Sequence, residues 1–371
     1  MMIDSVSDLL LERIAAGDFP SAVYLVAEKG EVKAADAFGR AVMEPEVIGA
    51  RPDTIYDLAS ITKPLITGLL SAILIDRGEL SLDDHVSDLL LDFSAPDKNE
   101  ITVGQLLTHT SKFAAWLPLY LCVDDPDEII AEIARTPLRD TPDAVTYSDL
   151  NYIALGRLIE RITGVGLDDA AIEMIFEPLG LNRTFFCPPS IYRRATAASE
   201  IGNRFEQQTC EKDFPQYAIR PGAFRSGVIW GEVHDGNAHF MGGVAGHAGL
   251  FSTADNVFRL AHQFLPQYST LVSAETCELF TRNFSPCGNE HRSVGFQLAS
   301  TPESTAGVNM SPSSFGHLGF TGTSLWIDPV AERVFILLTN RTHCHDLPFV
   351  LLNSVRRRFH DLAIAWLDAN S

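Results

Sequence analysis

The chain has 371 residues, of which 46% are hydrophobic and 20% are charged, and its formal net charge is −20. An acidic surface of this kind repels the phosphates of nucleic acids and the headgroups of anionic lipids, so the composition argues against nucleic-acid and membrane partners. The 22 phenylalanines and many aliphatic residues can build a core, which excludes a disordered chain. The composition therefore predicts a soluble, acidic enzyme or small-ligand binder.

The N-terminal segment reads as an amphipathic helix, because Asp4 and Asp8 precede the apolar residues 9–11 and no basic stretch precedes them. This pattern is not a secretion signal, and we expect a cytoplasmic protein. The nearly apolar stretch 64–75 is too short to span a bilayer and predicts a buried helix.

The six cysteines have no C-x-x-C spacing, so we expect free thiols. His343-Cys344-His345 is the one segment that resembles a metal ligand set. Adjacent residues rarely converge on one ion, and we expect no metal there.

In chain order, residues 21–27 and 32–38 flank a Lys29-Gly30 turn and predict a β-hairpin. Residues 64–180 have helical signals, while 185–245 are rich in glycine, proline and aromatics and predict irregular structure. The later elements that we expect are strands at 294–298, 314–319, 324–327 and 334–339, and a helix at 347–366.

Strands at both ends of the chain with helices between them predict an α/β (α+β) fold with one antiparallel sheet flanked by the terminal helices. The expected sheet domain is discontinuous, residues 1–66 plus 290–371, and a mainly helical domain, residues 67–289, is inserted in it. A cleft between the two units is the natural place for a ligand.

The first candidate for chemistry is Ser60-Ile61-Thr62-Lys63. Pro64 lacks an N–H and is tolerated only in the first turn of a helix, so the helix is expected to start near Ser60. That places the hydroxyl at the positive end of the helix dipole, with Lys63 three residues on along the same face. A serine at this position otherwise serves only as a helix cap.

Two further segments carry reactive side chains. Tyr147-Ser148-Asp149 precedes a helical stretch, where Ser148 or Asp149 can cap the helix and Tyr147 can pack at its entrance. His317 lies among the closely spaced glycines of residues 316–322, which allow another backbone or a ligand to approach a strand. No lysine follows Lys212, so a proton-handling group on this strand is a histidine or an arginine.

Taken in order, Ser60-x-x-Lys63, Tyr147-Ser148-Asp149 and His317-Leu318-Gly319 resemble the three motifs of the class C β-lactamase-like serine hydrolases. That family includes penicillin-binding proteins, D-amino-acid peptidases and esterases. The segments 106–111, 246–253 and 319–323 are also similar to the family, and the resemblance covers roughly residues 10 to 365. It implies a β-lactamase/transpeptidase-like fold with the active site in the cleft.

The resemblance implies acyl transfer through a covalent intermediate on Ser60. Lys63 and Tyr147 would share the general-base and general-acid work, and which of them takes the serine proton stays open. His317 would complete a hydrogen-bond network to Tyr147. Neither a metal nor an organic cofactor is required.

The resemblance also implies a substrate-binding wall. The oxyanion would lie between the backbone N–H groups of Ser60 and Phe320, beside Gly319. Asp149 stands where β-lactamases usually carry a substrate-binding asparagine. His317 replaces the usual lysine, and Leu318 stands where a threonine or serine hydroxyl usually binds a substrate carboxylate.

These departures favour an esterase-like serine hydrolase with weak or no β-lactamase activity, acting on a small ester, amide or peptide. The alternatives are a β-lactamase, or a cytoplasmic amidase or peptidase acting on muramyl or D-amino-acid cell-wall fragments, since relatives of that kind have segments similar to Val233-His234-Asp235. An alternative of another class is a non-hydrolysing penicillin-recognising sensor or scaffold. The oligomeric state stays open.

Overall fold

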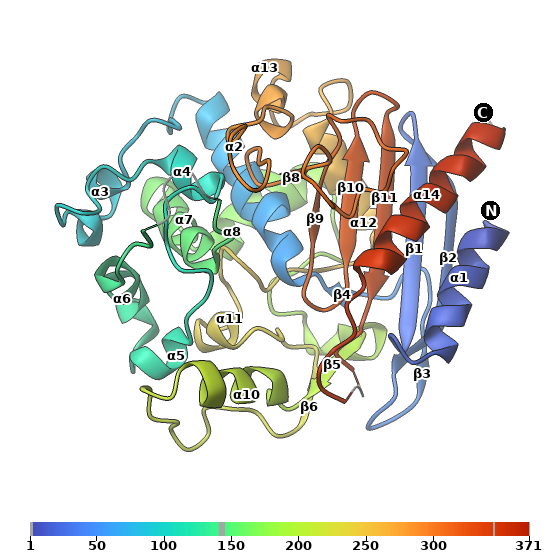
Figure 1. Ribbon diagram of the computed structural model, residues 1–371, viewed down its shortest axis with the longest axis horizontal. Coiled ribbons are helices and arrows are strands. Elements are labelled where there is room, and N and C mark those ends of the chain that lie inside the picture. The colour runs from blue at the N-terminus through green and yellow to red at the C-terminus, as the bar shows by residue number, and fades with distance from the viewer. Residues whose placement is uncertain (1–2, 141–144, 344–345, 371) are drawn as a thin grey trace.

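A large antiparallel sheet occupies one half of the molecule, and helices surround it (Figure 1). The computed structural model describes residues 3–140, 145–343 and 346–370. The sheet has seven strands in the order β3-β2-β1-β11-β10-β9-β8. Its strands are β1 (Ser21–Glu28), β2 (Glu31–Val42), β3 (Ile48–Gly49), β8 (Gln297–Leu298), β9 (Phe315–Leu318), β10 (Ser324–Asp328) and β11 (Arg333–Thr339).

Strand β1 is buried along its whole length because both faces of the sheet are covered. Side chains alternate between the faces of a strand. Ala22, Tyr24 and Val26 pack with the terminal helices α1 (Asp4–Ala15) and α14 (Asn353–Asn370), which lie side by side on the outer face in Figure 1. The alternate residues of β1 belong to the main core, which is built with the helices of the central region.

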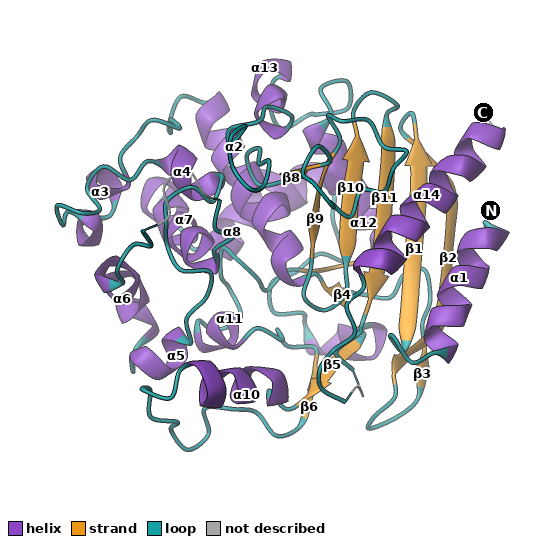
Figure 2. Ribbon diagram, viewed as in Figure 1, coloured by secondary structure: helices purple, strands orange, loops and turns teal. Residues whose placement is uncertain are grey.

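The central region is mainly helical, and Figure 2 shows its helices gathered on the other side of the sheet. They are α2 (Leu69–Asp76), α3 (Val86–Leu89), α4 (Val103–Leu107), α5 (Leu119–Cys122), α6 (Ile129–Arg135), α7 (Asp149–Thr163), α8 (Leu167–Ala171), α9 (Glu177–Leu179), α10 (Arg204–Asp213), α11 (Gly236–Phe240), α12 (Ala254–Ala261) and α13 (Ala274–Cys277). Two short antiparallel pairs accompany them: β4 (Tyr56–Asp57) with β7 (Phe251–Ser252), and β5 (Ala198–Ile201) with β6 (Val228–Trp230).

The predicted fold class is confirmed, since the large sheet is antiparallel, flanked by helices, and formed only by strands from residues 21–49 and 297–339 among those described. The predicted hairpin of β1 and β2 is present. The assignment of 185–245 as irregular was wrong in part, because this region contains the ten-residue helix α10. The last helix begins at Asn353, six residues later than expected, because Pro348 disfavours helix around it.

The apolar segment Ala59–Asp76 is long and apolar enough to cross a membrane by length and composition, but 83% of it is buried inside the protein. It is the core helix that the sequence predicts. Five cysteines are free thiols: Cys122, Cys187, Cys210, Cys277 and Cys287. Cys344 and His345, two members of the candidate metal triplet, lie outside the described residues. His343 receives the backbone N–H of Met43 on Nε2, at 2.8 Å.

Candidate active site

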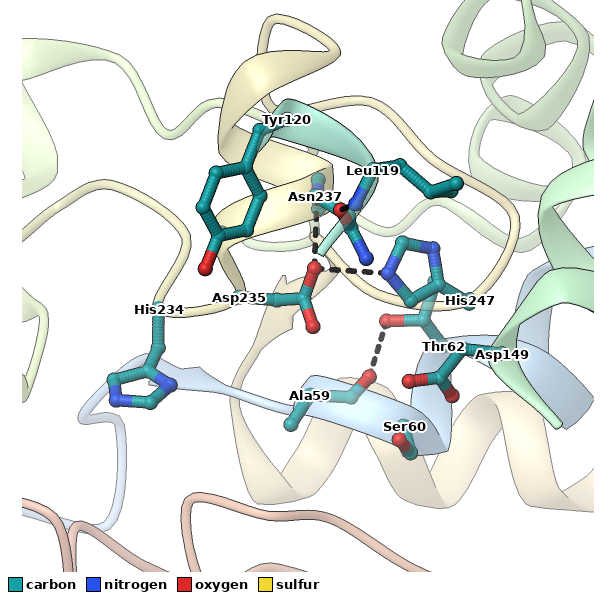
Figure 3. A network of polar contacts seen from close by, with 12 residues as sticks. Ala59, Ser60, Thr62, Leu119, Tyr120, Asp149, His234, Asp235, Asn237 and His247 are labelled. Carbon is teal, nitrogen blue, oxygen red and sulfur yellow. Dashed lines mark hydrogen bonds and ion pairs between the residues drawn. The ribbon is translucent and has the colours of Figure 1, made fainter. Parts of the chain in front are cut away.

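The segment that carries Ser60 is held in a strained turn. Ala59 has φ +47°, a left-handed conformation that costs free energy for a residue with a side chain. Its N–H donates to Asp57 Oδ1 at 2.8 Å. Its carbonyl accepts the Thr62 hydroxyl at 2.6 Å (Figure 3). These contacts fix the backbone on both sides of the serine.

Ser60 and Lys63 are in direct contact, since Lys63 Nζ lies 3.0 Å from Ser60 Oγ. The helix starts here as the sequence predicts, but as a 3-10 turn, Ala59–Ile61, followed by a wider π-helical turn, Lys63–Gly68, before α2. Pro64 has no N–H to donate and fits this irregular first turn. The three-residue spacing places the ammonium over the hydroxyl.

Lys63 is fully buried, and its charge has several partners. Asp149 Oδ1 lies 2.7 Å from Nζ, and the His247 carbonyl accepts a hydrogen bond from Nζ at 3.0 Å. Burial by itself lowers the pKa of Lys63, but the Asp149 carboxylate and the Tyr147 hydroxyl outweigh it and the pKa is raised overall. Lys63 is therefore an ammonium at neutral pH.

Asp149 begins helix α7, and Ser148 precedes it as the N-cap residue. The Ser148 hydroxyl donates to the Ala114 carbonyl at 2.6 Å, so it does not cap the helix. Asp149 lines the cavity and also forms the ion pair with Lys63.

The Tyr147 hydroxyl is buried beside Ser60 and Lys63. Burial raises the pKa of Tyr147, while the positive charge of Lys63 opposes that rise. Two imidazoles pack against the phenol, with ring centroids 4.7 Å away for His109 and 5.6 Å for His317. The structure therefore brings together the four side chains to which the sequence assigns catalysis.

The sequence analysis predicts a hydrogen bond between His317 and Tyr147, but the structure has none between these two residues. Its Nδ1 lies 2.9 Å from the Leu318 carbonyl, which can only accept, so Nδ1 carries the proton. Burial, followed by the charges of Arg292 and Lys63, keeps the pKa of His317 well below its ordinary value. The ring is neutral, and its buried Nε2, which has no partner among the described residues, is an acceptor.

An Asp235–His247 pair supports the loop that contacts Lys63, and the sequence analysis missed this role. His247 Nε2 lies 2.8 Å from Asp235 Oδ1, which also accepts the N–H of Ala238 in α11 (Figure 3). Donor atoms of Asp149, Asp235 and His247 lie within 4.8 Å of one another, a spacing that could hold a metal ion. Here they are engaged with Lys63 and with each other, and the ammonium repels a cation.

Gly319, the residue that follows strand β9, packs against the backbone segment that precedes Ser60. A Cβ on Gly319 would lie 2.5 Å from the Leu58 carbonyl, so only glycine allows this approach. The hydroxyl of Thr321 donates to the Asp57 carbonyl at 2.7 Å, and that of Thr323 donates to the Leu58 carbonyl at 3.1 Å. These bonds join the strand end to the backbone before Ser60.

A cavity of about 620 Å³ opens above these groups. Its apolar wall contains Trp116, Phe205, Leu318 and Phe320. Its polar lining includes Ser60, Tyr147, Asp149, Glu206, His234, Asp235, Glu290, Arg292, His317, Arg341 and Arg356. Burial raises the pKa of Glu206 to about 7. Such a cavity, with Ser60 and Tyr147 in its lining and the buried Lys63 ammonium in contact with Ser60, suits a small ligand.

Comparison with known proteins agrees with this geometry. A family model described as Beta-lactamase matches residues 6–350. The chain belongs to the β-lactamase family. A protein of Escherichia coli (strain K12) named putative D-alanyl-D-alanine carboxypeptidase is 31% identical over 353 residues, which cover 88% of this chain and 79% of the relative.

Two solved structures show the same fold. The octameric penicillin-binding protein homologue from Pyrococcus abyssi has a TM-score of 0.74 at 21% identity, covering 100% of this chain and 78% of its own. EstCE1, described as a hydrolase with promiscuous acyltransferase activity, has a TM-score of 0.73 at 20% identity, covering 97% of both chains. Members of this family are serine hydrolases, and this chain is a β-lactamase-family serine hydrolase.

Because Gly319 lies so close to neighbouring backbone, we expect the stability of the protein to fall when a side chain is added at this position. Gly319→Ala should lower the free energy of unfolding by about 1–3 kcal/mol, because the new methyl meets backbone that cannot move freely. Thermal unfolding would measure this. Gly227→Ala is the matched control, since a Cβ there meets nothing within 4 Å. Equal melting temperatures for the two variants would contradict the close packing of β9 on the serine segment.

Proposed function

We propose that this protein hydrolyses small esters and related acyl compounds through a covalent acyl-enzyme on Ser60. The observation that carries the proposal is the 3.0 Å contact between Ser60 Oγ, which lines the cavity, and the buried Lys63 Nζ, with the Tyr147 hydroxyl beside both. A serine is a weak nucleophile by itself and needs such neighbours to lose its proton.

In this proposal Ser60 Oγ attacks the carbonyl carbon of the substrate while its proton passes to the Lys63–Tyr147 pair. The pair accepts it in the form that has already lost one proton, with either Tyr147 as a phenolate or Lys63 as an amine. The backbone N–H of Phe320, which lines the cavity, supports the oxyanion together with that of Ser60; a donor of this kind contributes about 3 kcal/mol. The tetrahedral intermediate collapses, and the same pair returns the proton to the leaving group. Water then attacks the acyl-enzyme by the same steps and releases the acid.

The preference for neutral esters rests on what lines the cavity near Ser60. Asp149 is a carboxylate paired with Lys63, so it has no amide N–H to offer a substrate carbonyl. Leu318 has no hydroxyl with which to bind a substrate carboxylate. Trp116, Phe205 and Phe320 give the cavity apolar walls that suit an aliphatic or aromatic acyl group.

A second candidate is the removal of a C-terminal amino acid from a peptide, the activity in the name of the Escherichia coli relative. The observation in its favour is a pair of buried arginines in the cavity lining. Arg341 and Arg356 donate to backbone carbonyls and have no carboxylate partner among the described residues. Such guanidinium groups would favour a substrate with a carboxylate.

Replacement of the nucleophile tests the proposal directly. Ser60→Ala should abolish both fluorophosphonate labelling and p-nitrophenyl butyrate hydrolysis, and it should leave the fold intact because the Ser60 side chain is not fully buried. Intact-mass spectrometry would measure the labelling, absorbance of released p-nitrophenol the hydrolysis, and circular dichroism the fold. Labelling that persists in Ser60→Ala would move the nucleophile to another residue.

Specificity is tested by side-by-side kinetics with p-nitrophenyl butyrate and nitrocefin at one pH. We expect kcat/KM for the ester to exceed that for nitrocefin by at least about tenfold, which corresponds to roughly 1.4 kcal/mol of transition-state binding. Release of D-alanine from a D-alanyl-D-alanine peptide is measured in parallel. Efficient peptide or nitrocefin turnover with negligible ester turnover would replace the ester proposal with the corresponding alternative.

Asp149→Asn tests the electrostatics of the site. Asp149 raises the pKa of both Lys63 and Tyr147, so its removal lowers both pKa values. A base with a lower pKa is deprotonated at lower pH, and the rising limb of the rate against pH should therefore move to the acid side by about one unit. Asp127→Asn, an exposed carboxylate paired with Arg157, is the control for net charge. If the rising limb of the pH–rate profile does not move in Asp149→Asn, the ion pair does not govern acylation.

A further inference from the structure

Arg292 is a buried cation next to the Tyr147 ring that neither the sequence motifs nor the proposed chemistry uses. It lies in the loop before β8, and 5% of its surface is exposed. Its guanidinium carbon lies 5.3 Å from the centroid of the Tyr147 ring, close to the 4.9 Å that separates Lys63 Nζ from the same centroid. Tyr147 is thus in contact with two cations.

The guanidinium of Arg292 is only partly satisfied. Nη2 lies 2.8 Å from Glu290 Oε1, while Nε and Nη1 are buried without a hydrogen-bond acceptor among the described residues. Leaving charged donors unpaired in the interior is costly. Their position is not an accident of a loose side chain, because the Arg292 backbone is held on both sides: its N–H donates to Ser285 Oγ and its carbonyl accepts from Phe284, each at 2.8 Å.

The other titratable groups around Tyr147 do not replace this charge. His109 and His317 pack against its ring, and the pKa of each is well below its ordinary value, first because of burial and next because of the Arg292 charge. Both rings are therefore neutral. Lys63 is already paired with Asp149 at 2.7 Å.

We propose that Arg292 is a positioning residue for acylation, which stabilises the phenolate form of Tyr147 and so makes Tyr147 the acceptor of the Ser60 proton. The inference rests on the proposed function of Ser60. In the resting protein the phenol is neutral and two guanidinium donors lack an acceptor. When Tyr147 is a phenolate, the Arg292 charge faces an anion in a medium of low dielectric.

The test is the rate of fluorophosphonate labelling of Ser60 as a function of pH, which requires no natural substrate. Arg292→Met should move the rising limb of the plot of labelling rate against pH to the alkaline side by about one pH unit. It should lower the labelling rate at neutral pH about tenfold. Arg292→Lys keeps the positive charge, so the rising limb of its pH–rate profile should lie close to that of the unmodified protein. Arg157→Met, a partly exposed arginine on α7, is the matched control and should leave the limb in place.

Glu290→Gln provides an independent variant that leaves Arg292 present. It removes the negative charge beside Arg292 and keeps an oxygen for its hydrogen bond, so the limb should move to the acid side. A merely structural role for Arg292 predicts slower labelling without such a movement. A limb that stays in place in Arg292→Met or in Glu290→Gln overturns the proposal, and the Glu290 result decides if Arg292→Met does not fold.

Two further measurements distinguish this role of Arg292 from a direct contact with the substrate and from a failure of the proposed function of Ser60. An Arg292→Met variant that raises only the KM for carboxylate-bearing substrates would make Arg292 a substrate contact and overturn the proposal. If Ser60 is not labelled at any pH, the proposed function fails. The difference in tyrosinate absorbance between the protein and its Tyr147→Phe variant, titrated with and without Arg292→Met, then still decides whether Arg292 favours the phenolate.

Discussion

The burial of one ammonium group, Lys63, governs the arrangement of the site. Taking a charge of this size out of water costs several kcal/mol unless it is paired and hydrogen-bonded. The partners come from segments far apart in the sequence: Asp149 at the start of α7, the His247 carbonyl in the loop after α11, and Ser60 one turn away. Two of these partners, Ser60 and Asp149, also line the cavity.

Much of the fold could be predicted because its signals are local. The Val-, Tyr- and Leu-rich segment 21–27, the Lys29-Gly30 turn and the returning segment 32–38 lead directly to the hairpin of β1 and β2. The S-x-x-K spacing is also local, since residues three apart on a helical turn face the same way. The 3.0 Å contact of Ser60 and Lys63 follows from that spacing.

The contacts that tune the site could not be predicted, because they depend on tertiary packing. The His247 carbonyl reaches Lys63 across 184 positions of sequence, and nothing in the sequence specifies that distance. The ion pair of Asp149 was also missed, since the sequence assigns this residue only to the substrate. Arg292 lies outside every motif, and only its position against the Tyr147 ring gives it a role. The expected hydrogen bond between His317 and Tyr147 is absent: His317 Nδ1 donates to the Leu318 carbonyl, and Nε2 has no partner among the described residues.

The pairing of β1 with β11 links the completion of the candidate site to the completion of folding. Ala22 pairs with Thr339 at one end of this ladder, and Thr321 reaches Asp57 across 264 positions. Contacts so distant in sequence form late, after most of the loop-closure entropy has been lost. A ribosome-bound chain that already displays Ser60 and Lys63 still lacks the strand that faces them. The wall that faces Ser60 and Lys63 is therefore complete only when the last strands join the sheet.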